Sequence, residues 1–369
     1  MALDHLALAP DQRSLLAGMP FDGHHLVNGP PGSGKSALAV QRAVMLALTG
    51  EPVTLLTRSN LLRQSLEPEA RSLGPDEGLE VSTVHRWLHT WHRSVTGGPA
   101  PQTEDGWFDW PAVLQQAALS PRTGAGPLLV IDEGQDLPGD FYRLCRLLGA
   151  RTTVFADECQ RITDTQSTLA EIASRLTAAS RYDLGGNHRN TRPVAALAAR
   201  FHVGATAPPL PERDGPAPSL HRYGRASEVA DHIVEHTGRH PEHRTGVILR
   251  HTAHQLDLLA RLERRLPAGR VTAYVGKAAA GRYRSLDLVR PGVTLLTRAS
   301  AKGLGFDTVF VPDTHLDAGD DPSGSALRMA YYVLITRARQ ELCLGYAGTG
   351  EPPLLRGVDP DVLTRVGSP

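Results

Sequence analysis

The sequence predicts an α/β protein with two domains, each built around a parallel sheet. Short apolar segments alternate with helical segments in two successive runs, which is the pattern of parallel strands joined by crossover helices. The 369 residues are enough for two domains of ordinary size. In the first run, a glycine-rich loop separates the apolar residues 25–28 from a helical segment, residues 35–49, that contains no glycine or proline.

The loop reads GPPGSGKS at residues 29–36 and fits the pattern G-x-x-x-x-G-K-[ST] at every fixed position. Its glycines let backbone N–H groups turn around a polyphosphate, Lys35 supplies a mobile positive charge, and the Ser36 hydroxyl can ligate Mg²⁺. The helix that follows points its N-terminus at the phosphates. An ordinary glycine-rich turn would not need this strand and helix around it. We expect these residues to bind a nucleotide: Gly29, Gly32, Ser33, Gly34, Lys35 and Ser36.

Composition and charge narrow the class of protein. Lys+Arg and Asp+Glu both number 39, so there is no overall basic surface; because 36 of the positive residues are arginine, a local groove can still be basic. No apolar run is long enough to span a membrane, and the first residues, MALDH, lack the start of a signal peptide. Three widely spaced cysteines, Cys145, Cys159 and Cys343, indicate a reducing compartment, with neither a disulfide framework nor a zinc site. These features predict a soluble, cytoplasmic protein.

Gln12 precedes the glycine-rich loop and is a candidate for reading adenine. Its carboxamide offers a donor and an acceptor side by side, which is what the adenine edge requires. A solvated residue near the start of a helix would explain this glutamine equally well.

The first domain is expected at residues 1–180. Trp87 and Trp91 are four residues apart on one predicted helical face, which is more typical of core packing than of base stacking. Residues 96–126 are rich in Gly, Pro, Gln and Thr, and we interpret them as a small insertion outside the sheet with one helical patch at residues 111–119. Further strands are predicted at residues 52–57, 80–83, 128–131 and 152–156, and helical segments at residues 61–66 and 84–91.

Two acids follow the apolar strand at residues 128–131. Asp132 and Glu133 would lie at the carboxyl end of a buried strand, downstream of the phosphate-binding loop. Asp132 would hold Mg²⁺ through water, and Glu133 would take a proton from the attacking water. The alternative, an exposed acidic loop, is disfavoured because the strand is too apolar to be exposed.

The second domain is expected at residues 181–369 and has no phosphate-binding loop of its own. Residues 207–218 are rich in proline and are interpreted as an exposed connection. Strands are predicted at residues 181–184, 219–223, 246–249, 271–275, 292–297, 308–311 and 341–346, and helices at residues 193–201, 227–237, 253–266 and 325–339.

Seven segments resemble, in order, the motifs of the UvrD/Rep-like superfamily 1 helicases. One short motif is weak evidence, whereas seven in the right order are specific. The segments are GPPGSGKS at 29–36, VSTVH at 81–85, DEGQD at 132–136, ADECQ at 156–160, NHR at 187–189, AKGLGFD at 301–307 and YVLITRAR at 332–339.

The resemblance implies two tandem RecA-like P-loop NTPase domains with parallel sheets, and with ATP and Mg²⁺ in a cleft between them. It implies that Gln160 senses the γ-phosphate and that Arg189 and Arg337 reach across as arginine fingers, which would couple hydrolysis to domain closure. His188 stands where the family has an aromatic residue that stacks on adenine, and Gly303 belongs to the nucleotide-binding residues.

The sequence departs from the family where nucleic acid would bind. Arg58 and Ala299 replace an aromatic residue and a histidine, and residues 161–165 contain no aromatic residue. Stacking on aromatic rings is worth about 1–3 kcal/mol per base, so the usual means of stepping along a strand is weakened. On the nucleotide side, Gly305 replaces a glutamate, with loss of a ribose contact. By resemblance the nucleic-acid contacts would be Arg58, Asn60, His85 and Ser300.

Two functions from different classes fit this pattern. One is an ATP-dependent DNA helicase or translocase that moves on single-stranded nucleic acid. The other is an ATP-driven switch or regulatory subunit that controls a protein partner, for instance a nuclease, without processive unwinding. A partner chain could supply accessory domains that this short chain lacks. A P-loop kinase of small molecules would leave Gln160, Arg189 and the TRAR segment without a purpose.

Overall fold

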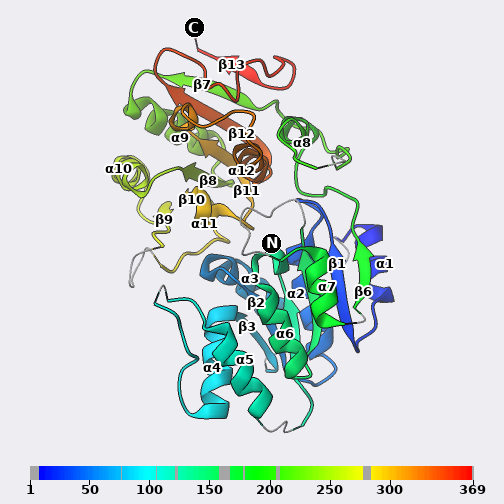
Figure 1. Cartoon of the computed structure of the whole chain (residues 1–369). Helices are drawn as coiled ribbons and strands as arrows, with labels where there is room; N and C mark the ends of the chain where they lie inside the picture. Colours follow the sequence, from blue (N-terminus) through cyan, green and yellow to red (C-terminus); the bar gives the residue numbers. More distant parts are fainter. Residues whose placement is uncertain are drawn as a thin grey trace. The chain divides into compact units, whose positions relative to one another are not determined.

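The computed structural model describes residues 8–75, 77–104, 106–120, 124–157, 167–177, 179–204, 208–276 and 284–367. The chain divides into two compact units, Met1–Gly185 and Gly186–Pro369, which we call the N-terminal and C-terminal units (Figure 1). The boundary expected from the sequence is residue 180. Each unit is described by itself below.

The N-terminal unit contains a six-stranded sheet in the order β3-β2-β4-β5-β1-β6, counted over its described residues. Every pair of neighbouring strands is parallel, so all carboxyl ends lie at one edge, where ligands bind in open α/β sheets. The strands are β1 (His24–Asn28), β2 (Val53–Thr57), β3 (Leu79–Thr83), β4 (Leu128–Ile131), β5 (Arg151–Ala156) and β6 (Ser180–Asp183).

Two helices of the N-terminal unit are not predicted from the sequence. They are α6 and α7; the second of them begins with a capping box, in which Thr168 Oγ1 accepts from the Glu171 N–H at 3.0 Å. α3 is also longer than expected and continues through Pro68, because its apolar face is buried and offsets the missing N–H. The helices are α1 (Pro10–Gly18), α2 (Lys35–Ala47), α3 (Asn60–Leu73), α4 (Val84–Thr96), α5 (Trp110–Leu119), α6 (Gly139–Leu147) and α7 (Leu169–Leu176).

The inserted segment lies outside the sheet but contributes to the core of the N-terminal unit. Phe108, Trp110 and Val113 are buried in one cluster with Phe141 of α6. Trp87 and Trp91 of α4 pack against the same cluster, as the sequence pattern predicts.

The C-terminal unit contains a seven-stranded parallel sheet in the order β13-β7-β12-β11-β8-β10-β9, again over its described residues. The short edge strand β13 is not predicted from the sequence. The strands are β7 (Ser219–Tyr223), β8 (Arg244–Leu249), β9 (Val271–Ala273), β10 (Gly292–Thr297), β11 (Phe306–Val311), β12 (Ala338–Ala347) and β13 (Thr364–Val366). The helices are α8 (Arg192–Ala199), α9 (Ala226–Arg239), α10 (Thr252–Glu263), α11 (Arg298–Ala301) and α12 (Ser325–Ile335).

The predicted helix at residues 325–339 is too long by four residues. α12 ends at Ile335, and β12 begins at Ala338, which pairs with Phe306 of β11. Sheet pairing therefore overrides the helical propensity of the last turn. Arg337 consequently lies in the turn between α12 and β12 rather than on a helix face.

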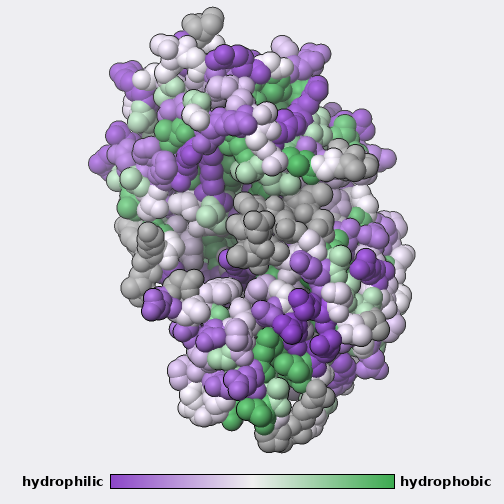
Figure 2. Space-filling model, viewed as in Figure 1, coloured by the Kyte–Doolittle hydropathy of each residue, from purple (hydrophilic) through white to green (hydrophobic). Residues whose placement is uncertain are grey.

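Figure 2 shows hydrophilic side chains predominating on the visible face of the C-terminal unit. None of the helices in the described ranges is both long and apolar enough to cross a membrane.

Candidate functional site

The phosphate-binding loop joins β1 to α2 and depends on two glycines with left-handed backbone conformation. Gly32 has φ 88° and Gly34 has φ 85°, a region that favours glycine. A Cβ on Gly34 would come within 2.3 Å of Gln12 Nε2, so the close approach of that side chain requires glycine as well.

Gln12, in the first turn of α1, connects that helix to the phosphate-binding loop by a hydrogen bond. Its Nε2 donates to the Ser33 carbonyl at 2.8 Å, and its Oε1 accepts from the Ala9 N–H at 2.9 Å. Only 4% of the residue is exposed, so the alternative of a solvated glutamine is wrong. Recognition of adenine by Gln12 stays a prediction.

Lys35 is buried among acceptors of its own loop. Its Nζ donates to the Gly29 carbonyl at 2.6 Å and to the Pro30 carbonyl at 3.0 Å, and lies 3.2 Å from Asp157 Oδ2. Asp157 follows β5, the strand between β1 and β4. This carboxylate is a site residue that the sequence analysis missed, although it belongs to the quoted segment ADECQ.

Asp132 is a buried carboxylate with no hydrogen-bond partner of normal geometry among the described residues. Both oxygens are shielded from solvent, and burial, reinforced by the nearby charge of Glu133, raises the pKa of Asp132 to about 7. The Ser36 hydroxyl and the Lys35 ammonium lie near enough to oppose that rise. A buried unpaired carboxylate is costly, whereas a carboxylate beside a hydroxyl is a suitable ligand set for Mg²⁺. These residues therefore fit the predicted metal.

Glu133 is held in an unusual backbone conformation. Its φ of 55° and ψ of 44° are left-handed, which is uncommon for a residue with a side chain and is concentrated at functional sites. Gln135 Nε2 donates to Glu133 Oε2 at 2.5 Å, while Gln135 Oε1 accepts from the Asp157 N–H at 2.9 Å. Gln135 thus links the predicted general base to the residue that pairs with Lys35, a role that was not predicted from the sequence.

Both acids are buried, with 1% of Asp132 and 6% of Glu133 exposed. The alternative of an exposed acidic loop is therefore wrong. Gln160, the predicted γ-phosphate sensor, lies outside the described residues.

In the C-terminal unit, the two residues that follow the NHR segment are hydrogen-bonded to the YVLITRAR segment. The Asn190 Nδ2 group donates to the carbonyls of Thr336, at 3.2 Å, and Ala338, the two residues that flank Arg337. The backbone continues this connection, since the Thr191 N–H donates to the Arg339 carbonyl at 3.0 Å.

Arg337 is buried in this unit, with 1% of its surface exposed. Its guanidinium donates to the Val333 carbonyl at 2.8 Å, the Leu304 carbonyl at 3.1 Å and Thr336 Oγ1 at 3.1 Å. These acceptors hold the guanidinium in place within the C-terminal unit.

Arg189 and Arg339 flank Gly305. A Cβ on Gly305 would lie 3.4 Å from Arg339 Nε and 3.5 Å from Arg189 Nε. Burial, together with the positive charges of Arg244 and Arg189, lowers the pKa of Arg339 to about 10.

The remaining nucleotide-binding predictions fall in the same unit. His188 is exposed and folds back over Gly186, whose added Cβ would meet its Nε2 at 2.4 Å. Gly303 is buried with φ 82°, so a side chain there would be strained.

The structure brings Arg58, Asn60 and His85 to one edge of the N-terminal sheet, because β2 and β3 pair with Thr57 opposite Thr83. Arg58 is exposed; it donates to the Asp136 carbonyl at 3.2 Å, and its guanidinium carbon lies 5.7 Å from the centroid of the Trp107 ring.

His85 is also exposed, with its ring 5.0 Å from that of Phe108. Asn60 Oδ1 accepts from Arg63 Nε at 3.2 Å. Ser300 belongs to the C-terminal unit, where its hydroxyl lies 3.0 Å from that of Thr297.

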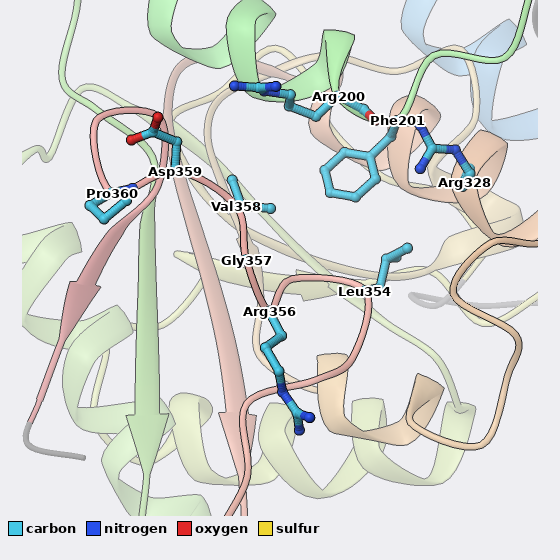
Figure 3. A pocket seen from close by; sticks show the side chains of 9 residues that line it. All are labelled: Arg200, Phe201, Arg328, Leu354, Arg356, Gly357, Val358, Asp359 and Pro360. Atoms are coloured by element: carbon cyan, nitrogen blue, oxygen red, sulfur yellow. Dashed lines mark hydrogen bonds between the residues drawn. The ribbon is translucent and has the colours of Figure 1, made fainter.

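A surface pocket of about 440 Å³ lies in the C-terminal unit, and none of the predicted site residues lines it (Figure 3). Three arginines border the pocket: Arg200, Arg328 and Arg356. Figure 3 shows Arg200 and Arg328 on either side of the Phe201 ring and Arg356 pointing away from both. The three guanidinium groups therefore do not form one anion site.

Comparison with known proteins bears on the fold and on the N-terminal unit. Residues 7–184 match the model of the AAA domain family AAA_30. The N-terminal unit is a P-loop NTPase domain. No curated protein matches the sequence.

Several solved structures are similar to the chain. Dbp5 of S. cerevisiae, bound to RNA and ADP BeF3, has a TM-score of 0.55 at 13% identity, over 99% of this chain and 95% of that chain. The helicase nonstructural protein 10 of an arterivirus has a TM-score of 0.42 at 14% identity, over 91% of this chain and 61% of that chain. The C-terminal domain of a possible DNA helicase from Lactobacillus plantarum WCFS1 has a TM-score of 0.37 at 22% identity, over 48% of this chain and 97% of that chain. The first likeness confirms two RecA-like α/β domains with parallel sheets.

Proposed function

We propose that this protein is an ATP hydrolase of the UvrD/Rep-like superfamily 1 that uses hydrolysis to move along single-stranded nucleic acid, most simply DNA. The observation that carries the proposal is the arrangement of Asp132 and Glu133. Asp132 is a buried carboxylate beside Ser36, and Glu133 has a left-handed backbone conformation and a carboxylate that accepts a hydrogen bond from Gln135. A metal ligand next to a positioned base is what hydrolysis of a phosphoanhydride requires.

Each residue then has a defined task. Lys35 exchanges the loop carbonyls and Asp157 for the phosphates of ATP. Ser36 and Asp132 hold Mg²⁺, which neutralises charge on the phosphates when it is bound. Glu133 accepts a proton from the attacking water, and Gln135 keeps its carboxylate oriented.

In this proposal ATP binds in a cleft between the two domains, residues 1–180 and 181–369, and the second domain supplies arginines. Arg189 and Arg337 act as the fingers, with Gln160 as the γ-phosphate sensor. Arg339 lies beside Gly305 together with Arg189 and adds a second positive charge there. Guanidinium groups that reach the phosphates only in the closed state couple hydrolysis to domain motion.

A second function is favoured by one observation on the nucleic-acid side. Arg58 stands at the position of a stacking aromatic residue and is instead engaged by Trp107 and the Asp136 carbonyl. A helicase-derived ATPase switch, in which cleft closure controls a partner such as a nuclease, does not need that stacking surface.

ATP turnover with and without single-stranded DNA at low salt distinguishes the two functions, with Glu133→Gln as the inactive reference. Strong stimulation by DNA supports the translocase. Turnover that is unchanged by DNA, or that requires a protein partner, supports the switch. Wild-type turnover no greater than that of Glu133→Gln would refute both, because each requires hydrolysis.

A further inference from the structure

A cluster of histidines on α9 has no part in the proposed hydrolysis. His232 and His236 of α9 and His240, which directly follows its last residue, are spaced four residues apart, the spacing of one helical face. That face lies against the sheet, where Glu341 of β12 and Thr308 of β11 are register partners.

We infer that His236, His240 and Glu341 form a binding site for a divalent transition-metal ion, with Zn²⁺ the ion that two imidazoles and one carboxylate suit best. This inference is independent of the proposed ATPase activity.

The distances fit a single ion. His236 Nδ1 lies 3.5 Å from Glu341 Oε2, and His240 Nε2 lies 3.9 Å from Glu341 Oε1. One donor atom from each of the three residues can be chosen so that all lie within 4.8 Å of one another. Ligand atoms of a tetrahedral Zn²⁺ site are about 3.4 Å apart, so small side-chain rotations bring all three into range.

The surroundings of His236 resemble those of a metal-ligating histidine. Its other nitrogen, Nε2, is 3.0 Å from Thr308 Oγ1, a contact of the kind that fixes the tautomer and the ring plane. The Phe310 ring packs edge-on at 5.4 Å between centroids and limits rotation further.

The site is open on one side. His236 is 5% exposed, whereas His240 is 34% and Glu341 is 24% exposed. An ion can therefore enter past His240, and water can take the fourth position. Once bound, the ion would tie the end of α9 to β12.

A neighbouring trio, His221, His232 and Cys343, also has donor atoms within 4.8 Å of one another. There His232 Nδ1 lies 2.8 Å from the Tyr223 hydroxyl and His221 Nε2 lies 2.9 Å from the Ser219 hydroxyl. No carboxylate belongs to that trio, and its thiol would give a bound Co²⁺ a sulfur charge-transfer absorption that the proposed site cannot give.

The test is titration of the full-length, chelator-treated protein with Co²⁺ and then Zn²⁺, without nucleotide and with excess Mg²⁺ to fill the Ser36–Asp132 site. We expect one Co²⁺ per chain with visible absorption of tetrahedral type, no sulfur charge transfer, and displacement by Zn²⁺. His240→Ala and Glu341→Gln should each weaken binding at least about tenfold. His254→Ala, an exposed histidine on α10, is the matched control and should bind like the wild type.

Zn²⁺ should also raise the melting temperature of the wild type but not that of Glu341→Gln, by mass action on the folded state. Thermal melts of the metal-free variants establish that they fold. Equal binding by wild type, His240→Ala and Glu341→Gln would overturn the assignment, as would no binding by the wild type. Loss of binding in Cys343→Ser together with a sulfur charge-transfer band would overturn it in favour of the neighbouring trio.

Discussion

The Lys35 ammonium lies 3.2 Å from the Asp157 carboxylate, and the two side chains are 6% and 1% exposed. Removing one partner of a buried ion pair leaves the other charge uncompensated, which typically costs more than the pair contributes. In the nucleotide-free protein Asp157 therefore balances the charge that Lys35 is proposed to deliver to the phosphates. Binding a nucleotide would replace one negative partner of Lys35 by another.

We expect Lys35→Ala to abolish ATP turnover and to lower the free energy of unfolding by roughly 3–5 kcal/mol, because Asp157 is left buried without its cation. Adding Asp157→Asn should recover much of the stability and none of the turnover. Chemical denaturation and a phosphate-release assay measure the two effects. Turnover in Lys35→Ala near the wild-type rate would contradict the assignment of the loop.

Asp132 should make the nucleotide-free protein less stable as the pH rises. Its pKa is raised from 3.8 to about 7, so the folded protein keeps a proton that the unfolded chain has released. The stability that this group contributes is complete below about pH 4 and is lost as the pH rises through about 7. By about pH 8 the loss amounts to a few kcal/mol, at roughly 1.4 kcal/mol per pKa unit.

The measurement is the melting temperature between about pH 5 and pH 8 for the wild type and Asp132→Asn, whose amide cannot titrate. The melting temperature of Asp132→Asn should not fall in this way, and Asp140→Asn, at a partly exposed position on α6, should behave like the wild type. Identical pH profiles for wild type and Asp132→Asn would mean that Asp132 is not protonated in the folded protein.

The site could be predicted from sequence where its residues are close along the chain. The local sequence pattern predicts the loop at residues 29–36 and the acids after β4. Apolar runs predict most strands of the two sheets. The Lys35–Asp157 pair joins residues 122 positions apart and depends on β5 lying beside β1. Strand order is set by packing, so that partner could not be derived from spacing.

The histidines on α9 illustrate the same limit. Their four-residue spacing is visible in the sequence, but Glu341 joins them only because β12 and β11 lie under the helix. The end of α12 is predicted wrongly for a different reason. The residues after Ile335 have helical propensity, but from Ala338 onward they pair in the sheet.

The two proposed arginine fingers should differ in their effect on stability. Arg337 makes three hydrogen bonds in the interior of the C-terminal unit, so Arg337→Ala leaves buried acceptors unpaired. Arg189 is half-buried, and its loss should cost less stability. If both reach the phosphates, each alanine variant should slow turnover by about 10³-fold while nucleotide binding changes little.

Single-turnover hydrolysis, binding of a fluorescent ATP analogue and thermal melts separate these effects. Arg200→Ala, an exposed arginine beside the pocket in Figure 3, is the control and should match the wild type in all three. An Arg337→Ala protein that is destabilised but hydrolyses ATP at the normal rate would reassign Arg337 to a purely structural role and leave Arg189 as the finger.

The edge of the N-terminal sheet that carries Arg58 and His85 should bind single-stranded DNA if the protein is a translocase. Arg58→Ala should weaken binding of single-stranded DNA equally for all DNA sequences. It should also reduce the slope of log affinity against log salt concentration by about 1, as expected for the loss of one phosphate contact. His85→Ala should weaken stacking, with a loss of about 1–3 kcal/mol.

Arg71→Ala is the matched control, because Arg71 is an exposed arginine on α3 with 78% of its side chain accessible. Fluorescence anisotropy at several salt concentrations, paired with DNA-stimulated ATP turnover, provides the readout. Parallel losses of affinity and of stimulation in the Arg58 and His85 variants, with Arg71→Ala unaffected, favour the translocase. Equal DNA affinity of all three variants, with ATP turnover that DNA does not stimulate, would mean that this edge of the sheet does not bind DNA. That outcome would favour the switch.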